Sequence, residues 1–205
     1  MDKYVITIAR QYGSGGRTIG QMLAKDLGIE FYDRDLIKKA SEESGISMDL
    51  FAESDEKAKK KGLFGRTKGY TGAVLDPSSS KFTSDENLFN YQAKAIKQLA
   101  DQESCIIIGR AADYILKDYD NVLSVFVHAP QDFLMARSAE KLTLKGKELE
   151  KYIAGIDKER ADYYKAHTGR DWYDARNYDL CLDSSKLGFE RCVEEIKAYM
   201  NVRFK

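Results

Sequence analysis

This sequence contains few histidines and few prolines. The first shortage argues against certain catalytic and metal sites, and the second is accompanied by an absence of internal repeats. His128 and His167 are the only two histidines among 205 residues. Two histidines give little support for histidine acid–base catalysis, for a hydrolase triad or for a zinc site. Pro77 and Pro130 are the only prolines, and no internal repeat is present. The chain is therefore not an array of repeated units.

Cysteine is nearly as rare, and its spacing is not that of a metal site. Cys105, Cys181 and Cys192 are odd in number and far apart. Two of them fall in predicted strands, so we expect buried, reduced thiols. Reduced thiols are typical of the cytoplasm, where we expect the protein to act.

The sequence also lacks an excess of one charge and any long apolar run. Thirty-three basic and thirty-three acidic side chains cancel, so no net field attracts nucleic acid or a membrane surface. No apolar stretch approaches the length that crosses a bilayer. Met1–Lys3 leads directly into the first predicted strand, so we expect no signal peptide. We therefore expect no membrane partner, and nucleic acid is an unlikely one; the oligomeric state stays open.

The hydrophobic pattern alternates strands with helices over residues 1–205, which we interpret as a single domain of ordinary size. Such alternation predicts an α/β fold, in which helices cover both faces of a parallel sheet. We expect five parallel strands in the order 2-3-1-4-5, with ligands at their carboxyl ends. The predicted strands are 4–9, 29–32, 104–109, 122–128 and 178–182. The predicted helices are 15–27, 34–44, 48–60, 86–102, 110–117, 131–142, 146–166 and 187–201.

A glycine-rich loop joins the first strand to the first helix, and this is the most informative segment. Strand, glycine loop and helix together direct backbone N–H groups and a helix dipole toward phosphate. The pattern is close to the P-loop, but arginine stands where lysine is expected. We expect the loop to bind the phosphates of ATP. The predicted ligands are Gly13, Ser14, Gly15, Gly16, Arg17 and Thr18, with the Thr18 hydroxyl also offered to Mg²⁺.

Arg17 leaves two interpretations open. Its guanidinium can neutralise charge during phosphoryl transfer, which makes it a candidate catalytic residue. It can equally point elsewhere, because an arginine is bulkier than lysine and not equivalent to it at a phosphate. Arg10, just before the loop, is a candidate substitute cation or an ordinary arginine at a strand end.

Five segments of the sequence, in this order and spacing, resemble the cytidylate kinase-like family. They are Ile8–Arg17, Phe31–Asp35, Ile108–Leu116, the Ile156–Tyr164 helix and Tyr178–Asp183. The resemblance implies a P-loop NTPase-type, three-layer kinase fold that uses ATP and Mg²⁺. It implies a helical acceptor-binding insertion over 34–103 and an arginine-bearing lid over 137–176. It also implies a nucleoside monophosphate, CMP or dCMP, as the acceptor.

The second strand ends in Asp33-Arg34-Asp35. Cytidylate kinases use this turn to hold the monophosphate, and kinases of the shikimate kinase type carry a similar Asp-x-Asp there. By this resemblance Asp33 is a candidate ligand of both acceptor and Mg²⁺, and Arg34 a candidate contact of the acceptor phosphate. The alternative is that Asp33 only caps the following helix.

The third strand ends in Ile108-Gly109-Arg110. Cytidylate kinases tend to place a metal-binding aspartate where this chain has Ile108, which removes a likely carboxylate. Arg110 remains a candidate for gripping the acceptor phosphate with both arms of its guanidinium. We interpret Asp113 as a residue of the helix surface; the alternative is that Asp33 or Asp113 takes the metal-binding role.

Arg137 and Arg160 are the candidate catalytic arginines of the lid. In monophosphate kinases such arginines move inward and neutralise the phosphoryl group in transfer. The alternative is a solvated helix face of paired charges, which would include Asp157. We expect few apolar contacts to hold residues 143–172.

Residues 61–85 form a long segment rich in glycine, serine and lysine. Its basic residues favour a flap over a phosphorylated substrate; contact with nucleic acid is the less economical alternative.

Three functions stay open at this point. The first is ATP-dependent phosphoryl transfer to CMP or dCMP. The second is a kinase similar to shikimate kinase, with another small acceptor. The third is a protein that binds nucleotide for sensing, without turnover.

Overall fold

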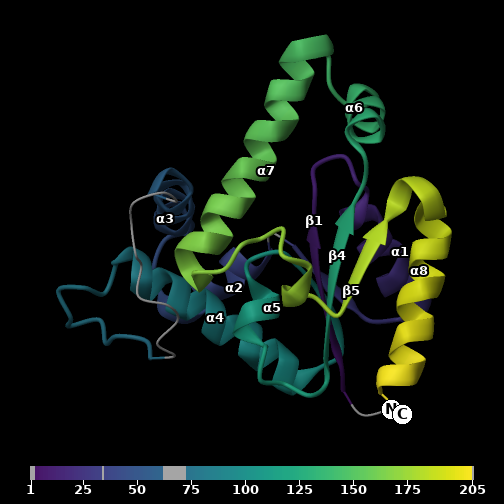
Figure 1. Ribbon diagram of the computed structural model, residues 1–205. Helices are drawn as coiled ribbons and strands as arrows, with labels where there is room; N and C mark the ends of the chain where they lie inside the picture. Colours follow the sequence, from purple (N-terminus) through teal and green to yellow (C-terminus); the bar gives the residue numbers. More distant parts are fainter. Residues whose placement is uncertain (1–2, 34, 62–72, 205) are drawn as a thin grey trace.

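The computed structural model describes residues 3–33, 35–61 and 73–204, and its centre is a parallel sheet (Figure 1). Every pair of neighbouring strands is parallel, and the order is β2-β3-β1-β4-β5. This confirms the predicted topology. The strands are β1 (Val5–Arg10), β2 (Glu30–Tyr32), β3 (Cys105–Ile108), β4 (Val122–His128) and β5 (Leu180–Asp183).

Two helical layers cover the sheet, because the strand residues on both faces are apolar. Ile6 and Ile8 face α1 (Gly16–Leu27) and α8 (Ser184–Arg203), in one core cluster. Val5 and Ala9 alternate with them and face the opposite layer. That layer consists of α4 (Asp85–Gln102), α5 (Ala112–Ile115) and the C-terminal part of α7 (Gly146–Thr168).

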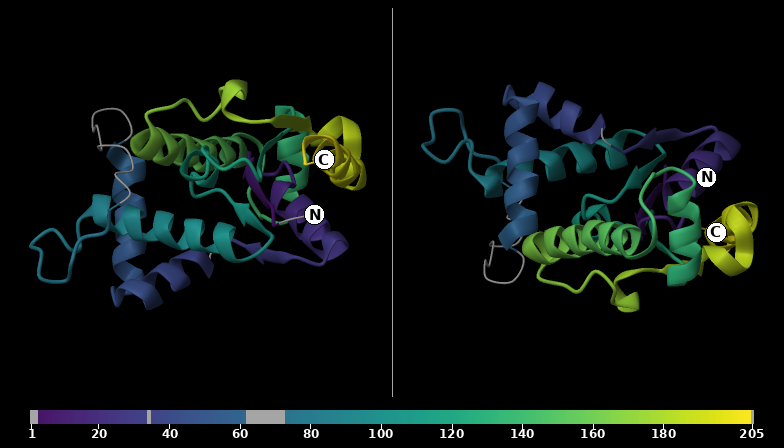
Figure 2. Two further views of the ribbon diagram at one scale, coloured as in Figure 1. Left: turned by 90° about the horizontal axis from the view of Figure 1, so that it is seen from below. Right: turned by 90° about the horizontal axis from the view of Figure 1, so that it is seen from above.

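Four further helical segments complete the described part of the chain. Helices α2 (Asp35–Ser44) and α3 (Met48–Lys61) pack on α4 around Phe51 and Leu88. Figure 2 shows α3 lying across α4 and α7, which it contacts. Helix α6 (Gln131–Ala139) follows β4, and a short 3₁₀ helix, η1 (Ala175–Asn177), precedes β5. No described helix is long and apolar enough to cross a membrane.

Part of the expected basic flap can be placed. Residues 62–72 lie outside the described residues. Ala73 and Leu75 are tied to α4: the Leu75 N–H donates to Asn87 Oδ1 at 2.8 Å, and Asn90 Nδ2 donates to the Ala73 carbonyl at 2.8 Å. The C-terminal part of this segment is therefore attached to the helix that follows it.

Three local expectations need correction. Helix α8 begins three residues earlier than predicted, at Ser184, and its continuous pattern is broken at Gly188, where φ is 75°. Cys181 is exposed, because β5 is an edge strand, whereas Cys105 and Cys192 are buried; all three thiols are free. The C-terminal half of α7 belongs to the main core, so it is not loosely held.

Candidate functional site

The glycine loop folds into the shape that its sequence predicts. Gly13 and Gly15 have left-handed backbones, with φ of 84° and 81°, which glycine adopts without strain. Gly15 is the N-cap of α1 and offers no side chain, and the first bond of the helix runs from the Ile19 N–H to the Gly15 carbonyl. The N–H groups of residues 16–18 therefore have no acceptor within the helix and are available to an anion.

Neighbouring elements hold the loop from both sides. A Cβ on Gly13 would lie 2.8 Å from the Leu134 carbonyl oxygen in α6, and one on Gly15 would overlap the Phe189 ring of α8. The buried Ser184 hydroxyl donates to the Ser14 carbonyl at 2.6 Å. Ser14 itself is fully buried and donates its N–H to the Gln11 carbonyl. Of the six predicted phosphate ligands, Ser14 is thus the one turned into the protein.

The loop forms one side of a cavity of about 280 Å³, the donor cavity. The described lining contains no carboxylate. Backbone donors together with an excess of cations suit a polyphosphate, so these residues fit ATP. The cationic side chains of the lining are Arg10, Arg17, Arg137, Lys141 and Arg160.

A second cavity, of about 390 Å³, adjoins the first and is called the acceptor cavity. Its described lining has aromatic rings, three guanidinium groups and four carboxyl groups. Arg10, Tyr12 and Arg160 line both cavities and so form their common wall. The charged groups of the acceptor cavity are Arg10, Arg110, Arg160, Asp33, Asp55, Asp113 and Glu159.

Asp33 pairs with Arg10 of this wall and with Arg17 of the donor cavity. Arg17 Nε donates to Asp33 Oδ2 at 2.7 Å, and Arg10 Nη2 lies 3.9 Å from Asp33 Oδ1. Burial and the adjacent Arg160 lower the pKa of Arg10 to about 9, and Asp33 opposes this shift. Arg10 thus keeps its charge at neutral pH, in a position where it reaches both cavities.

The fit to Mg²⁺ depends on the nucleotide. Among the described residues, no three acidic, histidine or cysteine side chains cluster in a way that would hold a metal. Thr18 lines the donor cavity, and the Asp33 carboxylate is engaged by Arg17. These residues fit an ion that arrives on phosphate oxygens and needs only one or two protein ligands.

Arg110 lines the acceptor cavity and has a strained backbone. Its φ is 60°, and that of Ala111 is 52°, both in the left-handed region that side chains disfavour. The guanidinium forms a close ion pair with Asp55 of α3 and lies 3.5 Å from Gln92 Oε1 of α4. Burial opposes the charge of Arg110 and Asp55 favours it, and the net effect raises the pKa of Arg110. Asp55 of α3 thus supplies a counter-charge that the sequence did not reveal.

Asp113 is not the surface residue that we expected. Its carboxyl lines the acceptor cavity and accepts a hydrogen bond from the Tyr164 hydroxyl at 2.6 Å. Burial raises its pKa to about 6, although the Tyr164 hydrogen bond acts in the opposite direction. The only indication in the sequence that Asp113 belongs to this site was its position three residues after Arg110.

The two lid arginines occupy different places. Arg137 pairs with Glu140 at 2.7 Å, and its guanidinium carbon lies 5.1 Å from the centre of the Phe189 ring. Arg160 lies on the common wall, over the Tyr12 ring. Both line the donor cavity.

The remaining described residues of interest add no polar side chain to either cavity. Asp35 is exposed and lines neither cavity, and Arg34 lies outside the described residues. Ile108 is buried at the carboxyl end of β3, where a metal-binding aspartate was a possibility. His167 stacks on Phe89 with ring centres 3.9 Å apart, and burial lowers its pKa to about 4. Packing is therefore its role here.

The order of the sheet, the glycine loop before α1 and the adjoining cavities define a kinase-like protein of the P-loop class. The model of the cytidylate kinase-like family matches residues 5–186, and the chain belongs to this family. No curated protein gives a significant match.

Solved structures confirm the fold. An uncharacterized protein from Eubacterium ventriosum has a TM-score of 0.71 at 24% identity, over 97% of this chain and 99% of that one. Shikimate kinase from Bacteroides thetaiotaomicron has a TM-score of 0.55 at 15% identity, over 97% of this chain and 98% of that one. The predicted three-layer kinase fold is therefore correct.

Proposed function

We propose that this protein transfers the γ-phosphoryl group of ATP to a nucleoside monophosphate, with CMP or dCMP as the acceptor, in the cytoplasm. The observation that carries the proposal is the common wall. A cationic cavity at a glycine loop opens beside a second cavity, and Arg10 and Arg160 reach both. Phosphoryl transfer needs positioning and charge neutralisation, and this arrangement offers both.

The predicted residues that line the two cavities have distinct roles in this proposal. The N–H groups at the start of α1 hold the donor phosphates, with Arg17 and Arg137 neutralising them. Arg160 neutralises the group in transfer from the common wall. Arg110 and Asp33 hold the acceptor. When bound with ATP, Mg²⁺ supplies further charge neutralisation on the phosphates, and Thr18 and Asp33 are the residues that would hold it.

A second candidate is transfer to a hydroxyl group of a small acceptor that is not a nucleotide, as in a kinase similar to shikimate kinase. The favouring observation is charge: the described lining of the acceptor cavity has more carboxyl than guanidinium groups, and Asp55 already pairs with Arg110. A dianionic phosphate must compete with those carboxylates, whereas hydroxyl groups can donate to them.

A third candidate is nucleotide binding without turnover. Two observations favour it. Arg17 is engaged by Asp33 in place of a free P-loop cation, and Ile108 replaces a potential metal-binding carboxylate.

ATP consumption by the purified protein separates the three. CMP and dCMP are tested against UMP, AMP and shikimate, with and without Mg²⁺. Cytidine is the matched control for CMP, because it differs only by the phosphate. We expect Mg²⁺-dependent consumption that requires CMP or dCMP and is absent with cytidine.

Two outcomes contradict the first proposal. Consumption with shikimate or cytidine, but not with CMP, supports the hydroxyl acceptor. Tight ATP binding without consumption on any acceptor supports the sensor.

A further inference from the structure

One carboxylate oxygen connects α7 to the beginning of the glycine loop. Asp157 is 4% exposed, although its helix face was a candidate for a solvated surface. Its Oδ1 accepts the Tyr12 N–H at 2.7 Å and the Arg160 Nη1 at 3.0 Å. Tyr12 lies 145 residues before Asp157 in the chain, so this contact exists only in the folded protein.

A second hydrogen bond connects α7 to the backbone just before the glycine loop. Arg160 Nη1 also donates to the Arg10 carbonyl at 2.9 Å. Arg10 is the last residue of β1, and the glycine loop begins just after it. The Arg160 guanidinium is therefore attached to the loop backbone and to Asp157 at the same time, on the wall that the two cavities share.

The charges explain why a carboxylate is needed there. Arg10 and Arg160 lie close enough for Arg160 to lower the pKa of Arg10, and Asp157 acts in the opposite direction. Without Asp157, two guanidinium groups would share a largely buried wall with less compensation. The long Arg160 side chain could relieve the repulsion by turning toward solvent.

We infer that Asp157 is a positioning residue, which holds the Arg160 guanidinium on the wall between the donor and acceptor cavities. The inference rests on the proposed phosphotransferase function, but it does not depend on the identity of the acceptor. Asp157 acts through Arg160, since no contact of its own with a substrate is needed.

A double-mutant cycle tests this coupling. The variants are Asp157→Asn, Arg160→Ala and the double variant, assayed for kcat and for KM of ATP. Asp162→Asn is the matched control, because Asp162 lies on the same helix and pairs with the exposed Lys158. We expect Asp157→Asn to lower kcat at least about tenfold with KM for ATP within about twofold, because the transferring group is affected and the bound nucleotide is not.

The double variant decides the mechanism. If Asp157 acts through Arg160, the double variant is no slower than Arg160→Ala alone. Multiplicative losses, or an equal loss in Asp162→Asn, would overturn the inference.

A second measurement works without turnover. Asp157→Ala removes the acceptor of the Tyr12 N–H, so hydrogen exchange at Tyr12 should accelerate at least about tenfold while the central strands keep their protection. Unchanged exchange at Tyr12 would overturn the inference even in an inactive protein. Absence of turnover in the wild type, together with faster exchange in Asp157→Ala, would reject the proposed function and leave the link between Asp157 and the loop standing. If Asp157→Ala fails to fold, the kinetic cycle with the isosteric Asn variant decides.

Discussion

Arg17 stands where the P-loop motif has lysine, and it forms an ion pair with Asp33. Lysine in this position reaches along the loop as a compact charge. Here the Arg17 side chain is 59% exposed and extends across the end of β2 to Asp33. Its Nε is used in that pair, and the residue still lines the donor cavity. The guanidinium therefore retains donors for a phosphate.

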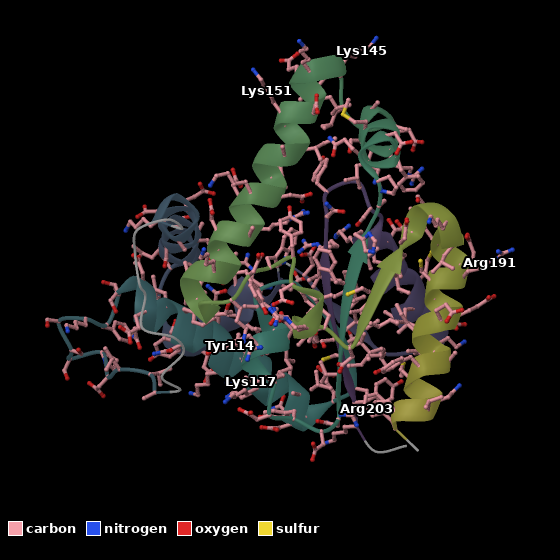
Figure 3. The ribbon with its side chains drawn as sticks, in the orientation of Figure 1. Tyr114, Lys117, Lys145, Lys151, Arg191 and Arg203 are labelled. Carbon is pink, nitrogen blue, oxygen red and sulfur yellow. The ribbon has the colours of Figure 1, made fainter. Side chains whose placement is uncertain are left out.

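We predict that Arg17→Ala weakens ATP binding by about 1.5 kcal/mol, roughly tenfold. This is the low end for a charged hydrogen bond, because solvent screens an exposed side chain. Titration calorimetry with a non-hydrolysable ATP analogue measures the change. Arg191→Ala is the control: Arg191 is exposed and points away from α8 into solvent (Figure 3). Equal affinities of the two variants would show that Arg17 only anchors Asp33.

The raised pKa of Asp113 leads us to predict that the stability of the protein depends on pH. This pKa is raised from 3.8 in the unfolded chain to about 6 in the folded protein, so the folded state binds the proton more tightly. Stability that depends on this proton is present below pH 4 and is lost as pH rises toward 6. We expect the free energy of unfolding of the wild type to fall relative to Asp113→Asn over this range, by up to about 3 kcal/mol.

Urea denaturation of both proteins at several pH values measures this difference. The comparison with the variant is needed because His167 acts in the opposite direction. Its pKa is lowered from 6.5 to about 4, so its contribution is lost as pH falls through that range. A constant difference between wild type and Asp113→Asn from pH 4 to 6 would show that Asp113 is not the buried acid described here.

At the scale of elements, α7 has two differently packed halves. Its N-terminal half carries Leu149 and Ile153, which pack in a small cluster with α6. Its C-terminal half carries Tyr163 and Tyr164, which belong to the main core. In Figure 3 the N-terminal end stands away from the sheet, with Lys145 and Lys151 directed outward. The first half can therefore open at a lower free-energy cost than the second.

We predict that closure over substrates involves α6 and the first half of α7. In the free protein, amides of residues 146–153 should exchange with solvent faster than those of 157–166. ATP together with the correct acceptor should protect the first group and leave the second nearly unchanged, since a closing lid excludes water from phosphoryl transfer. Hydrogen exchange with mass spectrometry measures both groups. Equal protection of residues 146–153 with and without both ligands would show that this segment is not a lid.

The net charge of the whole molecule is zero, but the linings of the two cavities differ in the sign of their charged groups. The donor cavity has only cationic charged groups in its described lining, whereas carboxyl groups outnumber guanidinium groups in the acceptor cavity. A net charge of zero conceals this division. The parallel sheet produces it, because the carboxyl ends of β1, β2 and β3 bring the glycine loop, Asp33 and Arg110 to one edge.

Much of this arrangement could be predicted, because it follows from local patterns. Apolar periodicity placed every strand within two residues of its observed bounds, and the order of the sheet followed from the rules for parallel connections. The glycine loop, Asp33 and Arg110 directly follow strands, so their gathering was foreseeable. The start of α8 was missed because Gly188 interrupts its pattern.

The α/β class, the glycine loop and the candidate arginines of the cavities could be predicted from the sequence, since each depends on residues adjacent in the chain. The partners of those arginines become visible only when distant segments of the chain are brought together. Asp55 reaches Arg110 from α3, and Asp157 reaches Tyr12 and Arg160 from α7. The positions of Asp55 and Asp157 depend on how the helices pack around Phe51 and Tyr163, and these two rings pack with residues that are distant in the sequence. Packing of distant side chains leaves no periodic signal in the chain, so these carboxylates could be found only in the folded protein.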